Sequence, residues 1–221
     1  MIVKIYLKGI ENFGNYITIT DKICIFSEDV CKNIVLSSNK IWKKLKMIPF
    51  RSYDQNFIGN MILGNTNGLI ISNFFSDYKL RYLIKNSWDD IKILRLDDNR
   101  NNPGSFMTVS NFHTILGRNL QKKTIQKIKS YLKTSVYLYE NNFFTINKFN
   151  FMIFENSCLI SPVYLEYYLQ TKKPVELPLY CTTVSNGCNY PGLALLFNKN
   201  ICLLNSSTNN NELKVINKFI N

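Results

Sequence analysis

Alanine, arginine and histidine are nearly absent from this sequence. The 221 residues include one alanine, five arginines and one histidine, against 30 asparagines, 26 isoleucines and 22 lysines. No apolar run approaches the roughly 18 residues that a membrane-spanning helix needs. The N-terminus, MIVKIYLKG, carries lysines within its apolar stretch and has no small-residue cleavage site, so it does not match a signal peptide. We therefore expect a soluble protein that is not exported.

Patterns for metal binding and disulfide formation are also missing. The six cysteines include no CxxC pair and His113 is the single histidine, whereas zinc sites need closely spaced ligands. Cys24, Cys158 and Cys202 lie inside apolar runs, where a free thiol behaves as a small core residue. We predict six reduced thiols, no metal site and no cofactor.

The charge balance is basic, with 27 lysines and arginines against 15 acidic residues and a net charge of +12. Such a balance indicates polyanionic partners such as RNA. The favoured residues also have AT-rich codons, so nucleotide composition explains the charge equally well. The apolar fraction of 46% is enough for a folded core and excludes a disordered chain.

Short strand-like apolar runs recur about every 45 residues in three series. The first series is centred on Thr18, Met61, Met107, Met152 and Leu195. The second is centred on Cys24, Ile70, Ile115, Leu159 and Cys202. The third is centred on Ile48, Ile93, Leu138 and Leu177, and the N-terminal run around Ile5 supplies its fifth member. A constant period of this kind is typical of a repeat architecture.

Helix signals fall between the second and third series. Helices are expected to begin at Ser27, at Ser76-Asp77, near Leu120, at Ser161-Pro162 and at Thr208. Each unit therefore consists of strand, strand, helix and strand, and five units fill residues 1–221 as a single domain. Because no strand follows the fifth helix, we expect the N-terminal strand to join the fifth unit and close the ring. The predicted fold is a five-bladed α/β propeller with pseudo-fivefold symmetry and helices on the outside.

This architecture resembles the pentein fold. Within it, the segment IGNMILGNTNGLIIS at residues 58–72 is followed, in order and spacing, by IKILRLDDN, GSFMTVSNFHTIL, PLYCTTVSNG and NKNICLLNSSTNNNEL. With this ordered set of motifs the chain resembles the translation initiation factor six family, most densely at residues 58–72. The similarity is low per residue but runs almost from end to end.

The resemblance implies a binding protein and not an enzyme. Members of that family bind the intersubunit face of the large ribosomal subunit, where they contact rRNA and a ribosomal protein near the sarcin-ricin loop. They sterically block joining of the small subunit, take part in large-subunit biogenesis, and are released by a GTPase and its partner protein. The resemblance also implies a monomer without membrane contact, in the cytoplasm, nucleus and nucleolus.

Candidate binding residues lie in the turn that precedes the first-series strand of each unit. These turns contain Gly14-Asn15, Gly59-Asn60, Gly104-Ser105, Asn150 and Pro191-Gly192. Equivalent positions should share one rim of the disc, where exposed amides and hydroxyls would form a flat polar docking face. The resemblance marks the first three turns as ribosome-binding, with Gly14, Asn15, Gly59, Asn60, Gly104 and Ser105.

Two of these residues depart from the family pattern. The family commonly has arginine in place of Asn60 and asparagine in place of Ser105, so both departures should weaken docking. We further expect Gly59→Arg and Gly104→Arg to reduce binding while leaving the fold intact.

Two alternatives remain open. One is an RNA-binding or scaffold pentein without a ribosome role, which the basic charge and the departures at Asn60 and Ser105 allow. Candidate RNA contacts are the lysines at 122, 123, 127, 129 and 133, which also suit a solvated helix surface. Lys40, Lys43, Lys44 and Lys46 around Trp42 are the better rRNA candidate, because an aromatic lies among the charges. A guanidine-modifying hydrolase would use His113 as base, Cys181 or Cys188 as nucleophile, and Asp97-Asp98 as the guanidinium clamp. The hydrolase is disfavoured because His113 falls in an expected core strand without an obvious acidic partner.

Overall fold

A computed structural model of the chain describes residues 1–6, 10–28, 45–51, 57–87, 90–97, 102–139, 145–171, 173 and 175–221. The strands in this part of the chain form five three-stranded sheets. In sequence order of their first strands, the sheets contain β2 (Ile17–Ile19), β3 (Ile23–Ser27) and β4 (Lys46–Phe50); β5 (Ile62–Gly64), β6 (Gly68–Ile71) and β7 (Lys92–Arg95); β8 (Met107–Val109), β9 (His113–Leu116) and β10 (Ser135–Leu138); β11 (Phe151–Phe154), β12 (Ser157–Ile160) and β13 (Leu179–Cys181); and β14 (Leu195–Phe197), β15 (Cys202–Asn205) and β1 (Ile2–Ile5).

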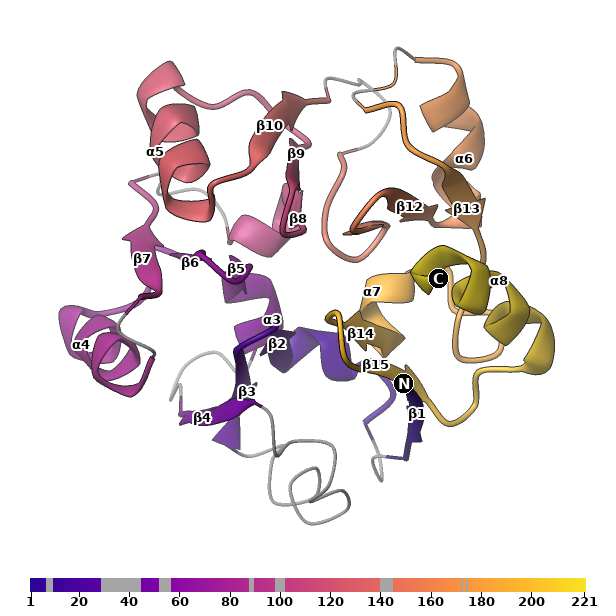
Figure 1. Cartoon of the computed structure of the whole chain (residues 1–221), viewed down its shortest axis with the longest axis horizontal. Coiled ribbons are helices and arrows are strands. Elements are labelled where there is room, and N and C mark those ends of the chain that lie inside the picture. Colours follow the sequence, from indigo (N-terminus) through magenta and orange to yellow (C-terminus); the bar gives the residue numbers. More distant parts are fainter. Residues whose placement is uncertain are drawn as a thin grey trace.

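Every sheet has the same internal pattern. The first two strands form an antiparallel hairpin, and the third strand runs parallel to the second. A parallel neighbour requires a crossover connection. In the second, third and fourth sheets the crossover contains α4 (Asp77–Asn86), α5 (Lys122–Leu132) and α6 (Pro162–Leu169), and α8 (Asn210–Ile220) follows β15. Figure 1 shows the sheets arranged around a common centre with these helices on the outside.

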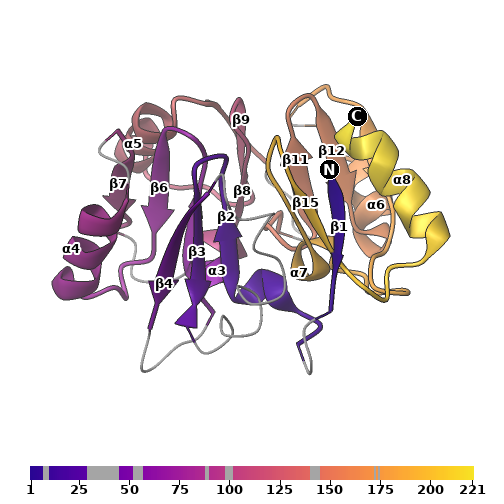
Figure 2. The ribbon, with the colours of Figure 1, turned by 60° about the horizontal axis from the view of Figure 1, so that its bottom comes forward.

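The N-terminal strand completes the fifth sheet, as predicted from the repeat. β1 runs parallel to β15, with Ile2 opposite Cys202 and Ile5 opposite Asn205. Figures 1 and 2 both show β1 beside β15. The first and last parts of the chain therefore share one unit.

The hydrophobic core is divided into clusters that lie between neighbouring sheets. Ile5 and Leu203 of the fifth sheet pack with Phe13 and Ile17 of the first unit. Four further clusters join the first to the second, the second to the third, the third to the fourth and the fourth to the fifth units. Because each cluster is shared by two units, removing one unit would expose apolar surface of both neighbours. Exposing that surface would cost about 25 cal/mol per Å².

Several local expectations needed correction. The third strand of the fourth unit lies at 179–181 and does not include Leu177, since Pro178 between them has no N–H to donate to a sheet. The last helix is capped by Asn209 and not Thr208, because Asn209 and Glu212 form a reciprocal capping box. The spacing of Leu80, Leu83 and Ile84 predicts one apolar face of α4, but Ile84 is 57% exposed.

Other expectations hold or lie outside the described residues. Ser76 caps α4 by accepting a hydrogen bond from the Lys79 N–H. Five of the six cysteines are described and are free thiols. Ser27 ends β3, and the helix expected after it falls mainly within 29–44, outside the described residues. In the part of the chain that the structure describes, no helix is both long and apolar enough to cross a membrane.

Candidate functional site

Short turns precede the first strand of every sheet and lie at the same end of the molecule. They are η1 (Phe13–Asn15), α3 (Ile58–Met61), η2 (Pro103–Ser105), residues 147–150, and α7 (Pro191–Ala194). Contacts link η1 to both α3 and α7, and α3 to η2. Figure 2 shows α3 and α7 toward one end of the sheets, and the hairpin between β2 and β3 at the other. We call the surface formed by these five turns the turn face.

The glycines of the turn face are contact points between units. A Cβ atom added at Gly59 would overlap the carbonyl oxygen of Gly14 and lie 2.7 Å from that of Ile17. One added at Gly104 would lie 2.5 Å from Asn60 Oδ1 and 2.8 Å from its carbonyl oxygen. Glycine is required at both positions because the neighbouring backbone occupies the volume of a side chain.

The expectation that the fold tolerates arginine at these glycines is therefore wrong. Gly14, Gly59, Gly104 and Gly192 are all buried, because each backbone packs against the next turn around the centre. Gly59→Arg and Gly104→Arg cannot leave the fold intact, since even a methyl group lacks room at either site. Such variants would report on folding and not on partner binding.

The polar residues beside these glycines are only partly accessible. Asn15, Asn60 and Ser105 are half-buried. The Ser105 hydroxyl donates to the carbonyl oxygen of Asn102 at 2.7 Å. Among the described residues, the buried Oδ1 atoms of Asn60 and Asn102 have no hydrogen-bond partner. The polar rim predicted from the sequence is thus present, but less exposed than expected.

Lys148 occupies the centre of the turn face. Its ammonium group donates to the carbonyl oxygens of Gly59 at 2.6 Å and Gly14 at 3.1 Å. Burial lowers the pKa of Lys148 to about 7. The sequence pattern points to Asn150 in this turn and leaves Lys148 unmarked. Alignment of the units on their first strands would have revealed it, because Lys148 stands three residues before β11, where the other units have glycine.

The rest of the turn face is uncharged. Lys148 is the single charged residue among the described turn residues 12–16, 57–61, 102–106, 147–150 and 189–193. Aromatic side chains are exposed between the amides, with Phe57 at 49% and Tyr190 at 41%. The Tyr16 and Phe57 rings are 6.0 Å apart. Aromatic enrichment and depletion of charge are typical of a protein interface, whereas binding to phosphates requires cations.

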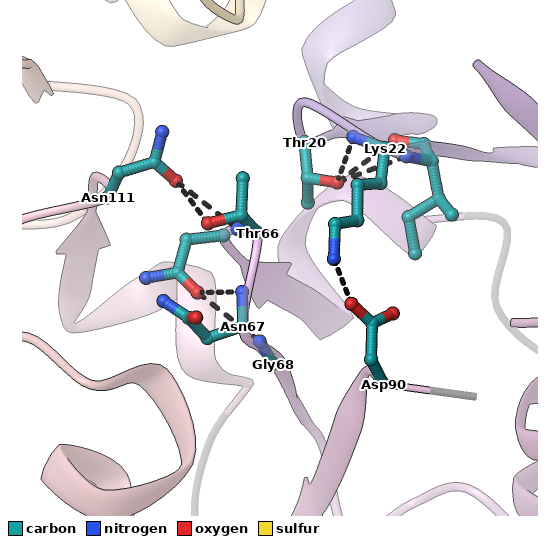
Figure 3. A network of polar contacts seen from close by, with 9 residues as sticks. Thr20, Lys22, Thr66, Asn67, Gly68, Asp90 and Asn111 are labelled. Carbon is teal, nitrogen blue, oxygen red and sulfur yellow. Dashed lines mark hydrogen bonds and ion pairs between the residues drawn. The ribbon is translucent and has the colours of Figure 1, made fainter. Parts of the chain in front are cut away.

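The opposite end of the sheets is cross-linked by side-chain amides. Asn65 Oδ1 accepts a hydrogen bond from the Asn67 N–H at 2.9 Å, and Asn65 Nδ2 donates to the Ser110 carbonyl at 3.1 Å. Asn111 Oδ1 accepts from the Thr66 N–H at 3.2 Å, as Figure 3 shows. These amides hold adjacent hairpins together, so their polar groups are already engaged within the protein.

The structure does not bring the residues of the hydrolase alternative together. His113 opens β9 in the third unit, and burial lowers its pKa. Cys181 lies in β13 of the fourth unit, where burial raises the thiol pKa and disfavours the nucleophilic thiolate. Asp97 pairs with Lys127 at 2.9 Å. Within the described residues, no hydrogen bond or ion pair joins His113, Cys181 and Asp97.

Of the two lysine clusters noted in the sequence, one lies on an outer helix and the other falls mostly outside the described residues. Lys122, Lys123, Lys129 and Lys133 are exposed on or beside the outer helix α5, away from the turn face. Lys46 lies in β4 and donates to the Ser87 carbonyl at 3.1 Å. The remaining members of the second cluster, and Asp98 of the hydrolase alternative, lie outside the described residues: Lys40, Trp42, Lys43, Lys44 and Asp98.

Five small α/β units around a common centre define a protein of the pentein class. A DDAH mutant from Pseudomonas aeruginosa, solved in complex with citrulline, shares this fold with a TM-score of 0.50. The alignment covers 82% of this chain and 80% of that one. Sequence identity is 9%, so the likeness concerns the fold alone.

Sequence comparison then places the chain within one family. The sequence model of the eIF-6 family matches residues 2–219, and the chain belongs to that family. The eukaryotic translation initiation factor 6 of Guillardia theta is 24% identical over 226 residues, covering 100% of this chain and 97% of the relative. That of Caenorhabditis elegans is 18% identical over 218 residues, covering 98% and 89%. The family resemblance inferred from the ordered motifs is confirmed.

Proposed function

We propose that this chain is a translation factor that binds the intersubunit face of the large ribosomal subunit and blocks small-subunit joining. Family membership supports the translation-factor role. The observation that carries the proposal is the turn face, an aromatic and amide surface without exposed charge on a protein with net charge +12. Such a surface suits a ribosomal protein near the sarcin-ricin loop better than bare rRNA.

We also propose that the five units form one closed ring and a single monomeric domain. Pairing of β1 with β15 supports closure, because it gives the fifth unit its third strand. The core cluster containing Ile5, Phe13 and Leu203 supports it further, since it joins the fifth unit to the first. A closed ring would hold the five turns in one plane and make the turn face a rigid platform.

The proposed mechanism is steric and involves no catalysis, metal or cofactor. A protein that covers one side of the joint between two subunits excludes the other subunit by mass action. Its removal must then be driven, which is the part assigned to a release GTPase and its partner protein. We also propose that the protein acts in the cytoplasm and in the nucleus, including the nucleolus, as a part in large-subunit biogenesis would require.

Within the turn face, we propose that the half-buried amides of Asn15 and Asn60 and the hydroxyl of Ser105 contact the ribosomal protein. Asparagine at position 60 cannot supply the five donors of an arginine, and serine at 105 has one oxygen where an amide has two polar atoms. The exposed ring of Phe57 lies next to these groups and offers apolar contact area instead.

Co-sedimentation with purified ribosomal subunits tests the proposal. The wild-type protein should migrate with free large subunits and be absent from joined ribosomes, and it should reduce joining in a light-scattering assay. Asn15→Glu should weaken large-subunit binding by about tenfold or more, because a carboxylate would be desolvated at the interface. Asn156→Glu is the matched control, since Asn156 is exposed in the hairpin between β11 and β12 at the opposite end.

Three results would contradict the proposal. Wild-type protein that ignores large subunits would refute it outright. Equal binding to any RNA, abolished by modest salt, would favour the RNA-binding alternative and the α5 lysines. Production of citrulline from arginine, or its analogue from agmatine, would favour the hydrolase alternative.

A further inference from the structure

The position three residues before each first strand is occupied by glycine in four units and by lysine in one. The glycines are Gly14, Gly59, Gly104 and Gly192, and the lysine is Lys148. The four glycines pack so closely that a Cβ at any of them would meet backbone or side-chain atoms of the neighbouring turn. The fivefold repeat therefore leaves room for one side chain at the centre of the turn face, and Lys148 supplies it.

Lys148 contacts the equivalent turn of every other unit. Its backbone N–H donates to the Gly104 carbonyl at 3.1 Å, and its ammonium donates to the Gly59 and Gly14 carbonyls at 2.6 and 3.1 Å. A Cβ at Gly192 would overlap the Lys148 carbonyl oxygen and lie 2.8 Å from Phe149 Cα. One residue thus links the turns of all five units.

The ammonium bonds act on the peptide groups that carry the candidate docking residues. The carbonyl of Gly14 and the N–H of Asn15 belong to one peptide plane, and the same holds for Gly59 and Asn60. A hydrogen bond from an ammonium group is strong and has a preferred geometry, so it restrains the orientation of the peptide group that accepts it. The orientation of Asn15 and Asn60 on the turn face is therefore coupled to the position of Lys148 Nζ.

Stability alone does not account for a lysine at this position. Lys148 is buried, and among the described residues no carboxylate pairs with it. A buried ammonium without a counter-ion is costly. Its neighbours are neutral, namely backbone carbonyls and the Phe149 ring, whose centroid is 5.4 Å from Nζ.

The side chain also borders a small axial cavity of about 70 Å³. The first strands of all five sheets line it, through Thr18, Leu63, Thr108, Met152 and Leu196. Lys148 therefore borders both this cavity and the turns, close to the centre around which the units are arranged.

We propose that Lys148 is a positioning residue for large-subunit docking, which holds the turns of the first three units in one binding-competent arrangement. This inference rests on the proposed function for its binding partner. The residue does not touch the partner. Its ammonium acts through the carbonyl oxygens of Gly14 and Gly59, and its backbone N–H acts through that of Gly104.

Lys148→Met tests the inference, because methionine keeps the length and apolar stem of lysine but has no donor. Lys4→Met is the matched control, since Lys4 Nζ also donates to a backbone carbonyl, that of Thr208, at 2.6 Å, but lies in β1. Each variant is measured for affinity to purified large subunits, for melting temperature, and for amide hydrogen exchange.

Lys148→Met should lower large-subunit affinity by about tenfold or more and speed hydrogen exchange in the turn-face amides, while exchange in the strands stays as in wild type. Lys4→Met should bind as wild type does. Wild-type affinity in Lys148→Met, or faster exchange throughout the protein, would overturn the inference. If wild type itself does not bind large subunits, the proposed function fails, and local exchange in the turns still decides whether Lys148 positions them.

Discussion

Gly59→Ala separates two effects of opposite sign at the turn face. Gly59 lies in α3, and its φ is not in the left-handed region. Alanine is favoured over glycine in a helix by about 1 kcal/mol, and it also reduces the entropy of the unfolded chain. Local reasoning therefore predicts a more stable protein. Packing predicts the reverse, because the new Cβ would overlap the carbonyl oxygen of Gly14 and approach that of Ile17 to 2.7 Å.

The loss of stability in Gly59→Ala depends on which atoms must move to accept the new Cβ. Ordinary Cβ contacts begin near 3.4 Å. The atoms in the way belong to the backbone and cannot move aside by changing rotamer, so the first and second units must move apart to make room. Overpacking of a rigid site costs about 1–3 kcal/mol, occasionally more. Because the contacted atoms belong to the backbone, we place the cost at the upper end of this range, about 3 kcal/mol. After the gain of about 1 kcal/mol from helix propensity, we expect a net loss of about 2 kcal/mol. In a protein of this size that lowers the melting temperature by about 4–8 °C.

Thermal unfolding followed by circular dichroism measures this directly. Asn60→Ala is the matched control in the same helix, because it shortens an existing side chain and leaves the contact with the first unit free of new atoms. It should melt within about 3 °C of wild type. A Gly59→Ala protein that melts at or above the wild-type temperature would refute the idea that the glycines exist for contact between units.

Three further outcomes are expected, each checked by unfolding in urea. Burial lowers the pKa of Lys148 to about 7, below its ordinary 10.5, so between these values Lys148 binds more protons in the unfolded chain than in the folded one; wild type should therefore gain stability relative to Lys148→Met as pH rises across that window. Burial opposes ionisation of Glu212, yet hydrogen bonds from Thr183 and three backbone N–H groups lower its pKa. The stability that Glu212 contributes is present above the unfolded pKa and lost as pH falls through the folded one, so Glu212→Gln should cost about 1–3 kcal/mol at pH 7 and less near pH 3; a constant difference would contradict this. Deletion of residues 1–6 removes β1 and the buried Ile5, and should cost about 3 kcal/mol or more; an unchanged midpoint would argue against closure of the ring.

The sequence predicts the elements of this fold well because each unit repeats the same local signals. Apolar runs bounded by polar turns mark the strands, and Ser76 and Ser161 mark helix starts at which the structure also begins α4 and α6. Errors arise where two signals lie close together. Thr208 and Asn209 both suit an N-cap, but only Asn209 has glutamate three residues later.

The turn face was predicted less well, for a different reason. A glycine in a turn indicates that a side chain is disfavoured there. It does not show whether the cause is the conformation of an exposed turn or close packing against another unit. That distinction at Gly14 and Gly104 depends on the distance between units, which no local pattern contains. Lys148 has a different explanation. A lysine between Asn147 and Phe149 looks like an ordinary surface residue until the five repeats are aligned on their first strands, where the other four have glycine.

The crowding at the centre of the turn face has a consequence for binding. An interface loses affinity when loops must be ordered on association, and preorganised surfaces avoid that cost. Here the glycine contacts and the Lys148 hydrogen bonds leave the turns little freedom before any partner arrives. Asparagine at position 60 and serine at position 105 offer fewer hydrogen-bonding groups than the arginine and asparagine that the family resemblance leads us to expect there. A rigid platform reduces the number of strong contacts that docking needs, so loss of rigidity in Lys148→Met should weaken binding more than loss of any one rim side chain by substitution with alanine.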